Sequence, residues 1–163
     1  MHWSRAVAIL LALVLQTSVL PHLLPVGIVP DLLLVFAVLT GLYTPPRQAV
    51  WWGAAAGFLA DVNFGRFVGF HLVTKAAVAY GASVAGSKFY PRHPGVLAAL
   101  GGLAALGQEL VMYVLLRAYG LHLTLLPSLT RIVLPHALTL ALLTAILSPV
   151  AYHAFTVQPP AKG

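Results

Sequence analysis

Long apolar runs, separated by short polar or proline-rich stretches, divide the chain into six segments. The first run covers 6–24, and the fourth, fifth and sixth segments cover 69–89, 96–117 and 128–152, the last with Ser128 as its predicted N-cap and Pro135 inside it. At a rise of 1.5 Å per residue, about 20 helical residues cross a hydrocarbon core of about 30 Å. The pattern predicts an all-α bundle of about six transmembrane helices.

The second and third segments, 31–43 and 48–60, are shorter. Each gives about 20 Å of helix, so each either spans with the help of flanking turns or belongs to a helical pair that does not fully cross. Pro30 suits the first position of the second helix, where its missing N–H costs nothing. A Gly-rich connection is predicted at 61–70.

Composition strengthens the membrane assignment. Hydrophobic residues make up 60% of the chain and charged residues 7%, against about 25% charged residues in a soluble domain. The chain has no cysteine, which excludes disulfides and thiolate metal sites. The nine basic residues are scattered singly, so no nucleic-acid partner is expected. We predict a single integral membrane domain, 1–163, with a short flexible cytoplasmic tail at 157–163.

Charge placement predicts the orientation. Arg5 precedes the first run, but no small-x-small cleavage site follows it, which favours a retained helix over a signal peptide. Basic residues favour the cytoplasm. With the N-terminus inside, that side holds Arg5, Arg47, Lys88, Arg92 and Lys162, and the outer side holds Arg66, Arg117, Arg131, Asp31 and Asp61. An even helix count then puts both termini in the cytoplasm.

Small residues four apart mark predicted faces of helix contact, because membrane helices associate through close backbone approach. The third segment has Gly53 with Gly57, the fourth has Gly81 with Ala85, and Gly86 follows Ala82 by four. Two uses stay open for these positions. They pack helices within the chain, or they form a face for a partner helix.

Two ionisable residues, Lys75 and Glu109, lie well inside hydrophobic segments. A charge at this depth costs a few kcal/mol, so it is expected to be paired or functional. Counting from the outer helix ends places Lys75 about 9 Å and Glu109 about 12 Å deep, with His136 at a similar level. We predict a buried polar cluster of Lys75, Glu109 and His136 in the outer half, centred on a Lys75–Glu109 pair. In the alternative, Lys75 snorkels outward and Glu109 is protonated or bonds Gln108 or a serine.

Catalytic motifs are missing from the sequence. It has no HExxH, no His pair at i and i+4, and no serine in a nucleophile-elbow pattern, and three acidic residues leave little for metal binding. We therefore expect no enzyme activity, no cofactor and no metal.

Pro30-Asp31 followed by three leucines marks the start of the second helix. Gly57 with Asp61, followed by Gly65 and Gly69, marks the junction of the third and fourth helices. These two motifs resemble the rod shape-determining protein MreD family of bacteria. Capping and turning explain these residues locally without any ligand. The resemblance extends over most of the chain, roughly 6–152.

The resemblance implies a non-enzymatic component of the cell-wall elongation machinery in the bacterial inner membrane, which helps maintain rod shape. It implies binding to the transmembrane helix of MreC, and a complex with MreB, RodA and a penicillin-binding transpeptidase. The family is also similar in fold to the substrate-binding subunits of energy-coupling-factor transporters, which hold a small ligand in the outer half of a six-helix bundle.

Two functions therefore remain open, a scaffold for partner helices and a solute-binding transport subunit. A transport subunit needs a water-accessible pocket with inward-facing aromatic side chains. The aromatic residues here cluster near helix ends, as in membrane-interface belts. This distribution favours the scaffold.

Overall fold

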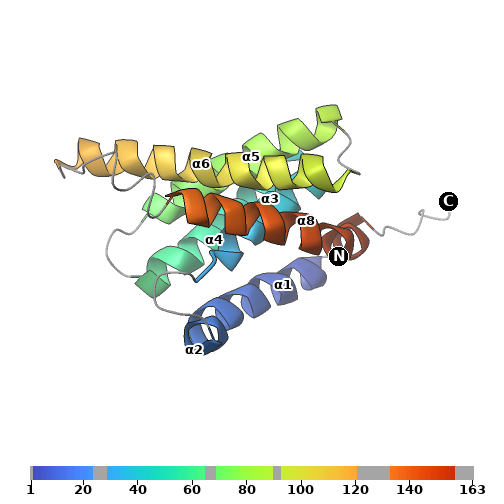
Figure 1. Cartoon of the computed structure of the whole chain (residues 1–163), viewed down its shortest axis with the longest axis horizontal. Coiled ribbons are helices and arrows are strands. Elements are labelled where there is room, and N and C mark those ends of the chain that lie inside the picture. Colours follow the sequence, from blue (N-terminus) through green and yellow to red (C-terminus); the bar gives the residue numbers. More distant parts are fainter. Residues whose placement is uncertain (1, 24–28, 65–68, 90–92, 121–132, 157–163) are drawn as a thin grey trace.

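The computed structural model describes residues 2–23, 29–64, 69–89, 93–120 and 133–156. Within these ranges the chain forms helices only, arranged as an all-α bundle (Figure 1). The helical segments are α1 (His2–Val14), η1 (Leu15–Val19), α2 (Leu20–Leu23), α3 (Leu32–Tyr43), α4 (Pro46–Phe64), α5 (Phe70–Phe89), α6 (Pro94–Ala118) and α8 (Leu134–Thr156). Because α1, η1 and α2 follow one another without a break, the described chain contains six helical rods, as the hydrophobic pattern predicts.

The short helix α3 forms the centre of the bundle. Every residue from 33 to 42 is buried, and α3 contacts α1, α4, α5, α6 and α8. A helix that is apolar on all sides has no face suited to water or headgroups and is stable when other helices enclose it. Helix α3 has 12 residues and is about 18 Å long. This short helix therefore lies inside the bundle, enclosed by the other helices.

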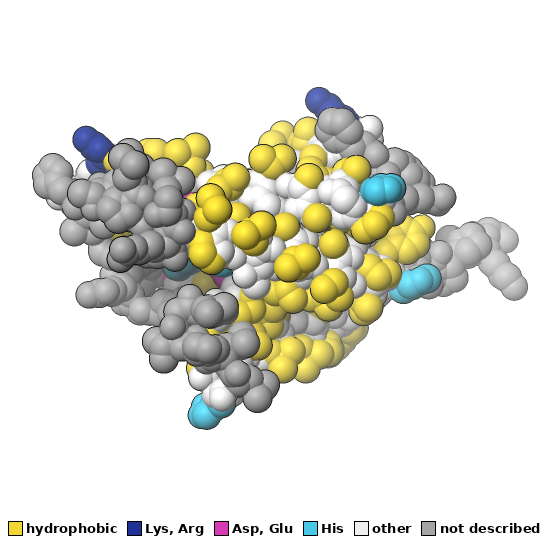
Figure 2. Space-filling view, in the orientation of Figure 1, with side chains coloured by type: hydrophobic (Ala, Val, Ile, Leu, Met, Phe, Trp, Pro, Cys, Tyr) yellow, Lys and Arg dark blue, Asp and Glu magenta, His cyan; other side chains and the backbone are white. Residues whose placement is uncertain are grey.

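The outer helices carry the apolar surface that faces lipid. Three described helical segments are long and apolar enough to cross a membrane: Trp3–His22, Pro94–Ala118 and Leu134–Phe155. The face over α6 and α8 is largely hydrophobic, and basic side chains appear only toward its ends (Figure 2). Such a surface would be unstable in water and suits the hydrocarbon core.

The third predicted segment is longer than expected. Helix α4 runs for 19 residues to Phe64, so the predicted start of a connection at Asp61 is wrong. Asp61 is only 2% exposed and accepts hydrogen bonds from the start of the next helix. These hydrogen bonds offset the free-energy cost of burying a carboxylate in the last turn of α4.

Other helix ends also differ from the prediction. Asp31 is the N-cap of α3, so Pro30 precedes the cap and is not the first helical residue. Helix α6 begins at Pro94, two residues early, because a proline is tolerated in the first turn. Helix α8 continues to Thr156 and contains Pro149, while the predicted N-cap Ser128 lies outside the described residues.

Both ends of the described chain lie at the same end of the bundle. Ser4 donates to the carbonyl of Ala154 at 3.2 Å. Arg5 donates to the carbonyl of Phe155 at 3.4 Å and to Oε1 of Gln48 at 3.1 Å. This arrangement agrees with an even number of crossings. That this end faces the cytoplasm stays a prediction.

Candidate functional site

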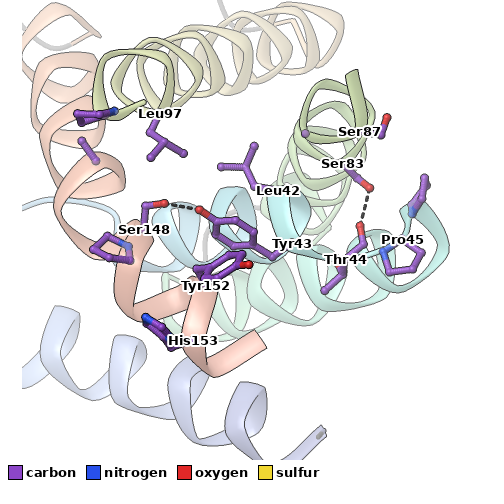
Figure 3. A pocket seen from close by; sticks show the side chains of 15 residues that line it. Leu42, Tyr43, Thr44, Pro45, Ser83, Ser87, Leu97, Ser148, Tyr152 and His153 are labelled. Carbon is purple, nitrogen blue, oxygen red and sulfur yellow. Dashed lines mark hydrogen bonds between the residues drawn. The ribbon is translucent and has the colours of Figure 1, made fainter. Parts of the chain in front are cut away.

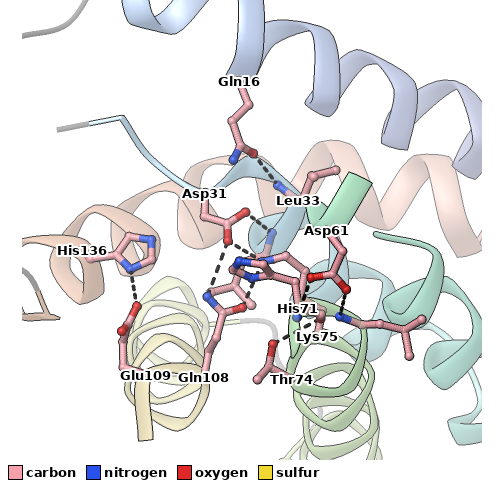
Figure 4. Close-up of polar contacts among 12 residues, drawn as sticks. Gln16, Asp31, Leu33, Asp61, His71, Thr74, Lys75, Gln108, Glu109 and His136 are labelled. Atoms are coloured by element: carbon pink, nitrogen blue, oxygen red, sulfur yellow. Dashed lines mark hydrogen bonds and ion pairs between the residues drawn. The ribbon is translucent and has the colours of Figure 1, made fainter. Parts of the chain in front are cut away.

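A buried ion pair joins three helices at the end of the bundle away from the chain termini (Figure 4). Lys75 Nζ, on α5, contacts Asp31 Oδ2 at the start of α3. The same ammonium donates to Gln108 Oε1 of α6 at 3.0 Å. Lys75 is fully buried, and the Asp31 side chain is 15% exposed. The positive charge inside this hydrophobic segment is therefore paired and hydrogen-bonded.

Asp31 also caps a helix. Its Oδ1 accepts the N–H of Leu34 at 2.9 Å, which satisfies a backbone donor at the start of α3. Gln16, on the π-helical turn η1, accepts the N–H of Leu33 at 3.1 Å. The widened turn of η1 carries this buried side chain toward the start of α3 (Figure 4). Two backbone donors of a buried helix thus find side-chain acceptors from within the bundle.

The predicted Lys75–Glu109 pair is wrong. Glu109 Oε1 instead lies 3.3 Å from His136 Nδ1 on α8. Lys75 uses Asp31 and the preceding α6 residue, Gln108. Neighbouring helical residues point about 100° apart, so Gln108 faces α3 and α5 while Glu109 faces α8. Lys75 does not snorkel outward, because its side chain is fully buried. Gln108 accepts from Lys75 instead of bonding Glu109, and Glu109 contacts His136.

The three residues of the predicted cluster differ in exposure. Lys75 is buried, whereas the side chains of His136 and Glu109 are 19% and 29% exposed. They belong to two separate pairs: an inner pair of Lys75 and Asp31, and an outer pair of Glu109 and His136. The two pairs come close at consecutive residues of α6, because Gln108 contacts the inner pair and Glu109 belongs to the outer one (Figure 4). Asp31, a family-motif residue with no predicted tie to Lys75, completes the inner pair.

Asp61 is the second carboxylate of this end and organises the start of α5. Its Oδ2 accepts the N–H groups of Gly69 and Leu72 at 2.8 and 3.0 Å. Its Oδ1 accepts the N–H of His71 at 3.0 Å. Gly69 has a φ of 102°, a conformation that side chains with a Cβ rarely adopt. Asp61 and Gly69 therefore act together as a turn and cap, and Gly65 lies outside the described residues.

The predicted packing glycines separate into two groups. A Cβ added at Gly53 would lie 2.6 Å from the Lys75 carbonyl oxygen, at Gly57 2.2 Å from the His71 oxygen, and at Gly86 2.7 Å from the Leu42 oxygen. These three glycines pack helices within the chain. Gly81 is different, because a Cβ there would meet nothing within 4 Å. Gly81 and Ala85 instead border a groove of about 290 Å³ between α5 and α6.

Two sites in the structure are not part of the sequence prediction. One is the link from Arg5 to α4 and α8, where Arg5 is only 1% exposed. The other is a cavity between the helix ends near Tyr43 and Ser148 (Figure 3). Arg5 is the fifth residue of the chain, so the sequence suggests only a charge that flanks the first helix. No local sequence pattern indicates the cavity.

The polar side chains at this end of the bundle are engaged in contacts with one another and with helix ends. In the described part of the chain, no group of three or more His, Asp or Glu side chains is placed to hold a metal ion. The carboxylates of Asp31 and Asp61 are used for capping and pairing. The polar groups at this end therefore act mainly between helices.

A comparison with models of known protein families identifies the family of the chain. The family model for rod shape-determining protein MreD matches residues 1–156. No curated protein and no solved structure matches the chain.

Proposed function

The chain belongs to the MreD family of rod shape-determining proteins, and from this premise we propose that it is a non-enzymatic scaffold of the cell-wall elongation machinery. Its partner would be the transmembrane helix of MreC, and through it the chain would join MreB, RodA and a penicillin-binding transpeptidase. The proposed location is the bacterial inner membrane, with both termini in the cytoplasm.

The observation that carries this proposal is the groove between α5 and α6. It is lined by small and apolar residues: Ala77, Val78, Gly81, Ala82 and Ala85 of α5, and Leu100, Leu103, Ala104, Gly107 and Val111 of α6. Gly81 and Gly107 have open space where a Cβ would point. Such a surface allows the close backbone approach on which membrane helices depend for association.

The contrast between the glycines supports a role for the groove. Gly53, Gly57 and Gly86 are used inside the bundle, where any larger residue would collide with backbone. Gly81 has no such internal use. A glycine costs up to about 1 kcal/mol of helix stability relative to alanine, so an outward-facing glycine inside α5 fits a contact with another helix.

The transport alternative gains less support. The polar residues expected to line an outer ligand pocket form caps and ion pairs with one another instead. The larger cavity borders the other end of the bundle. A scaffold that needs rigid helix placement uses buried polar contacts in this way.

The direct test is co-purification with MreC from the same cells in a mild detergent. Gly81→Leu would fill the groove without colliding inside the bundle, and we expect it to abolish recovery of MreC. Leu142→Trp adds comparable bulk to an exposed position on α8 and is the matched control. If both variants retain MreC as well as the wild type, the groove is not the contact. If the wild type itself fails to recover MreC, the scaffold proposal fails.

A further inference from the structure

A cavity of about 750 Å³ opens among the helix ends on the side of the bundle where the described chain begins and ends (Figure 3). It is bordered by the C-terminal ends of α3, α5 and α8, by the N-terminal end of α6 and by the turn that leads into α4. Helices surround it on several sides. It is separate from the carboxylates Asp31 and Asp61 and from the proposed groove for MreC.

The cavity wall combines hydroxyl groups with apolar side chains. Tyr43 and Ser148 are hydrogen-bonded across it, and Ser83 Oγ donates to the Thr44 carbonyl at 2.7 Å. Leu42 and Leu97 supply apolar surface. A cavity of this size with a few convergent polar groups is typical of a small-molecule site.

Pro149 adds a backbone acceptor to this wall. It lies inside α8 and has no N–H, so it cannot donate to the carbonyl of Ala145 four residues earlier. Both residues border the cavity. Thr44, Ser83 and Ser87 donate their hydroxyl protons to backbone carbonyls. In the Tyr43–Ser148 pair one hydroxyl donates to the other, which leaves one hydroxyl proton for a ligand, beside a carbonyl that lacks its usual helical partner.

Charge is segregated along the bundle. The three acidic residues of the chain, Asp31, Asp61 and Glu109, all lie toward the opposite end. Glu109 is 15 residues beyond Pro94, about 22 Å along α6. None of the described residues that border the cavity is acidic. Two exposed basic residues, Arg47 and Lys88, directly follow the cavity residues Pro46 and Ser87.

We propose that this cavity binds an anionic phospholipid from the adjacent leaflet. The phosphate lies at the mouth within reach of Arg47 and Lys88, and the one hydroxyl proton left by the Tyr43–Ser148 pair binds a polar oxygen of the lipid. Its apolar portion contacts Leu42 and Leu97. This inference is independent of the proposed scaffold function and assigns the chain a lipid-binding site.

The position of the cavity favours a lipid over a soluble anion. Tyrosine, proline and basic residues gather where α3 ends and α6 begins, and such residues mark the membrane–water interface. Phospholipid headgroups are concentrated at that level. Each basic residue near an anionic surface contributes about 1 kcal/mol, so the two charges together favour phosphatidylglycerol over a zwitterionic lipid.

The test is native mass spectrometry of the full-length protein in detergent, titrated with dioleoyl phosphatidylglycerol or dioleoyl phosphatidylcholine. We expect the wild type to prefer phosphatidylglycerol. Arg47→Gln and Lys88→Gln should each weaken its binding about fivefold and leave phosphatidylcholine unchanged. Arg117→Gln, an exposed basic residue at the opposite end, is the matched control and should change neither.

Ser87→Trp tests the cavity itself, because Ser87 is an exposed residue on its border and a tryptophan there would fill it. We expect loss of bound phosphatidylglycerol in a variant that still unfolds cooperatively. Equal binding of the two lipids by the wild type overturns the proposal. So does a preference that survives all three cavity-end substitutions. Inorganic phosphate that stabilises the wild type as much as the lipid does would identify a free-anion site and also overturn it.

Discussion

Lys75 on α5 is paired with Asp31, the residue that caps α3. One carboxylate thereby performs two tasks, since Oδ1 accepts the Leu34 N–H and Oδ2 neutralises a fully buried ammonium. Gln108 completes the contact from α6. The central helix, a lipid-facing helix and α5 are fixed to one another at one point. The pair therefore determines the relative rotation of three helices.

Breaking this pair on one side should be severe. Asp31→Asn keeps a side-chain acceptor for the cap but leaves the Lys75 ammonium without a counter-charge. We expect a loss of about 3–5 kcal/mol of unfolding free energy, as for other buried pairs that lose one partner. The double variant Asp31→Asn, Lys75→Met should recover much of this loss. Unfolding in mixed detergent micelles measures Asp31→Asn, Lys75→Met and the double variant, and strictly additive costs would show that the two side chains are not coupled.

The outer pair provides the control. Glu109 and His136 are partly exposed and 3.3 Å apart, so their interaction is weaker. Glu109→Gln is expected to lower the unfolding free energy by less than about 1 kcal/mol in the same assay. A larger loss for Glu109→Gln than for Asp31→Asn would contradict the assignment of the main anchor to Asp31.

Asp61 should control the order of the first turn of α5. Asp61→Ala removes the acceptor of three backbone N–H groups, and we expect a loss of about 2 kcal/mol. Asp61→Asn retains one acceptor oxygen and should lose less. Hydrogen exchange provides a local measurement, because the amides of Gly69, His71 and Leu72 should exchange faster in Asp61→Ala. Unchanged exchange at these three amides would refute the capping role.

The limits of the sequence prediction follow from helix geometry. Counting residues from a helix end gives depth, and it correctly marks Lys75 as a charge inside the bundle. Depth carries no information about direction around the helix axis, and that direction separates Gln108 from Glu109. Asp31 is visible in the sequence as a cap, but its approach to Lys75 depends on how α3 and α5 pack. Pairing between distant segments is a property of the assembled bundle.

The helix ends were predicted to different degrees for related reasons. Proline and glycine mark the borders of α3 and α5 well, because their backbone restrictions are local. The predicted end of α4 is too early, because Asp61 has the local features of a polar loop residue. Its acceptor role appears only when the start of α5 lies beside it. A buried charge with a distant backbone partner has no local signature.

Substitutions at glycine should distinguish internal packing from an outward face. Gly57→Ala would place a methyl group 2.2 Å from the His71 oxygen and 2.4 Å from the Leu72 Cα. Both atoms belong to backbone, so α4 and α5 must separate, at a cost of about 1–3 kcal/mol. Gly81→Ala meets open space and should leave unfolding unchanged within about 0.5 kcal/mol or stabilise α5 slightly. Equal effects at the two positions would contradict the observed division.

Arg5 should hold the first helix to the ends of α4 and α8. Its guanidinium donates to Gln48 Oε1 and the Phe155 carbonyl, and lies 5.8 Å from the centre of the Phe155 ring. A carbonyl in the last turn of a helix lies at the negative end of its dipole, which compensates the guanidinium. Among the described residues, no carboxylate forms an ion pair with Arg5. A lysine at this position has neither the planar fork nor the stacking surface.

We therefore expect Arg5→Lys to lose most of the stabilisation that Arg5→Ala loses, about 1–3 kcal/mol. Gln48→Ala should have a smaller effect, and combining it with Arg5→Ala should cost less than the sum of the two, because both remove the same bond. Limited proteolysis within 2–23, together with micellar unfolding, would report whether α1 has detached. If Arg5→Lys matches the wild type in both measurements, charge alone suffices at this position and the two directed hydrogen bonds contribute little.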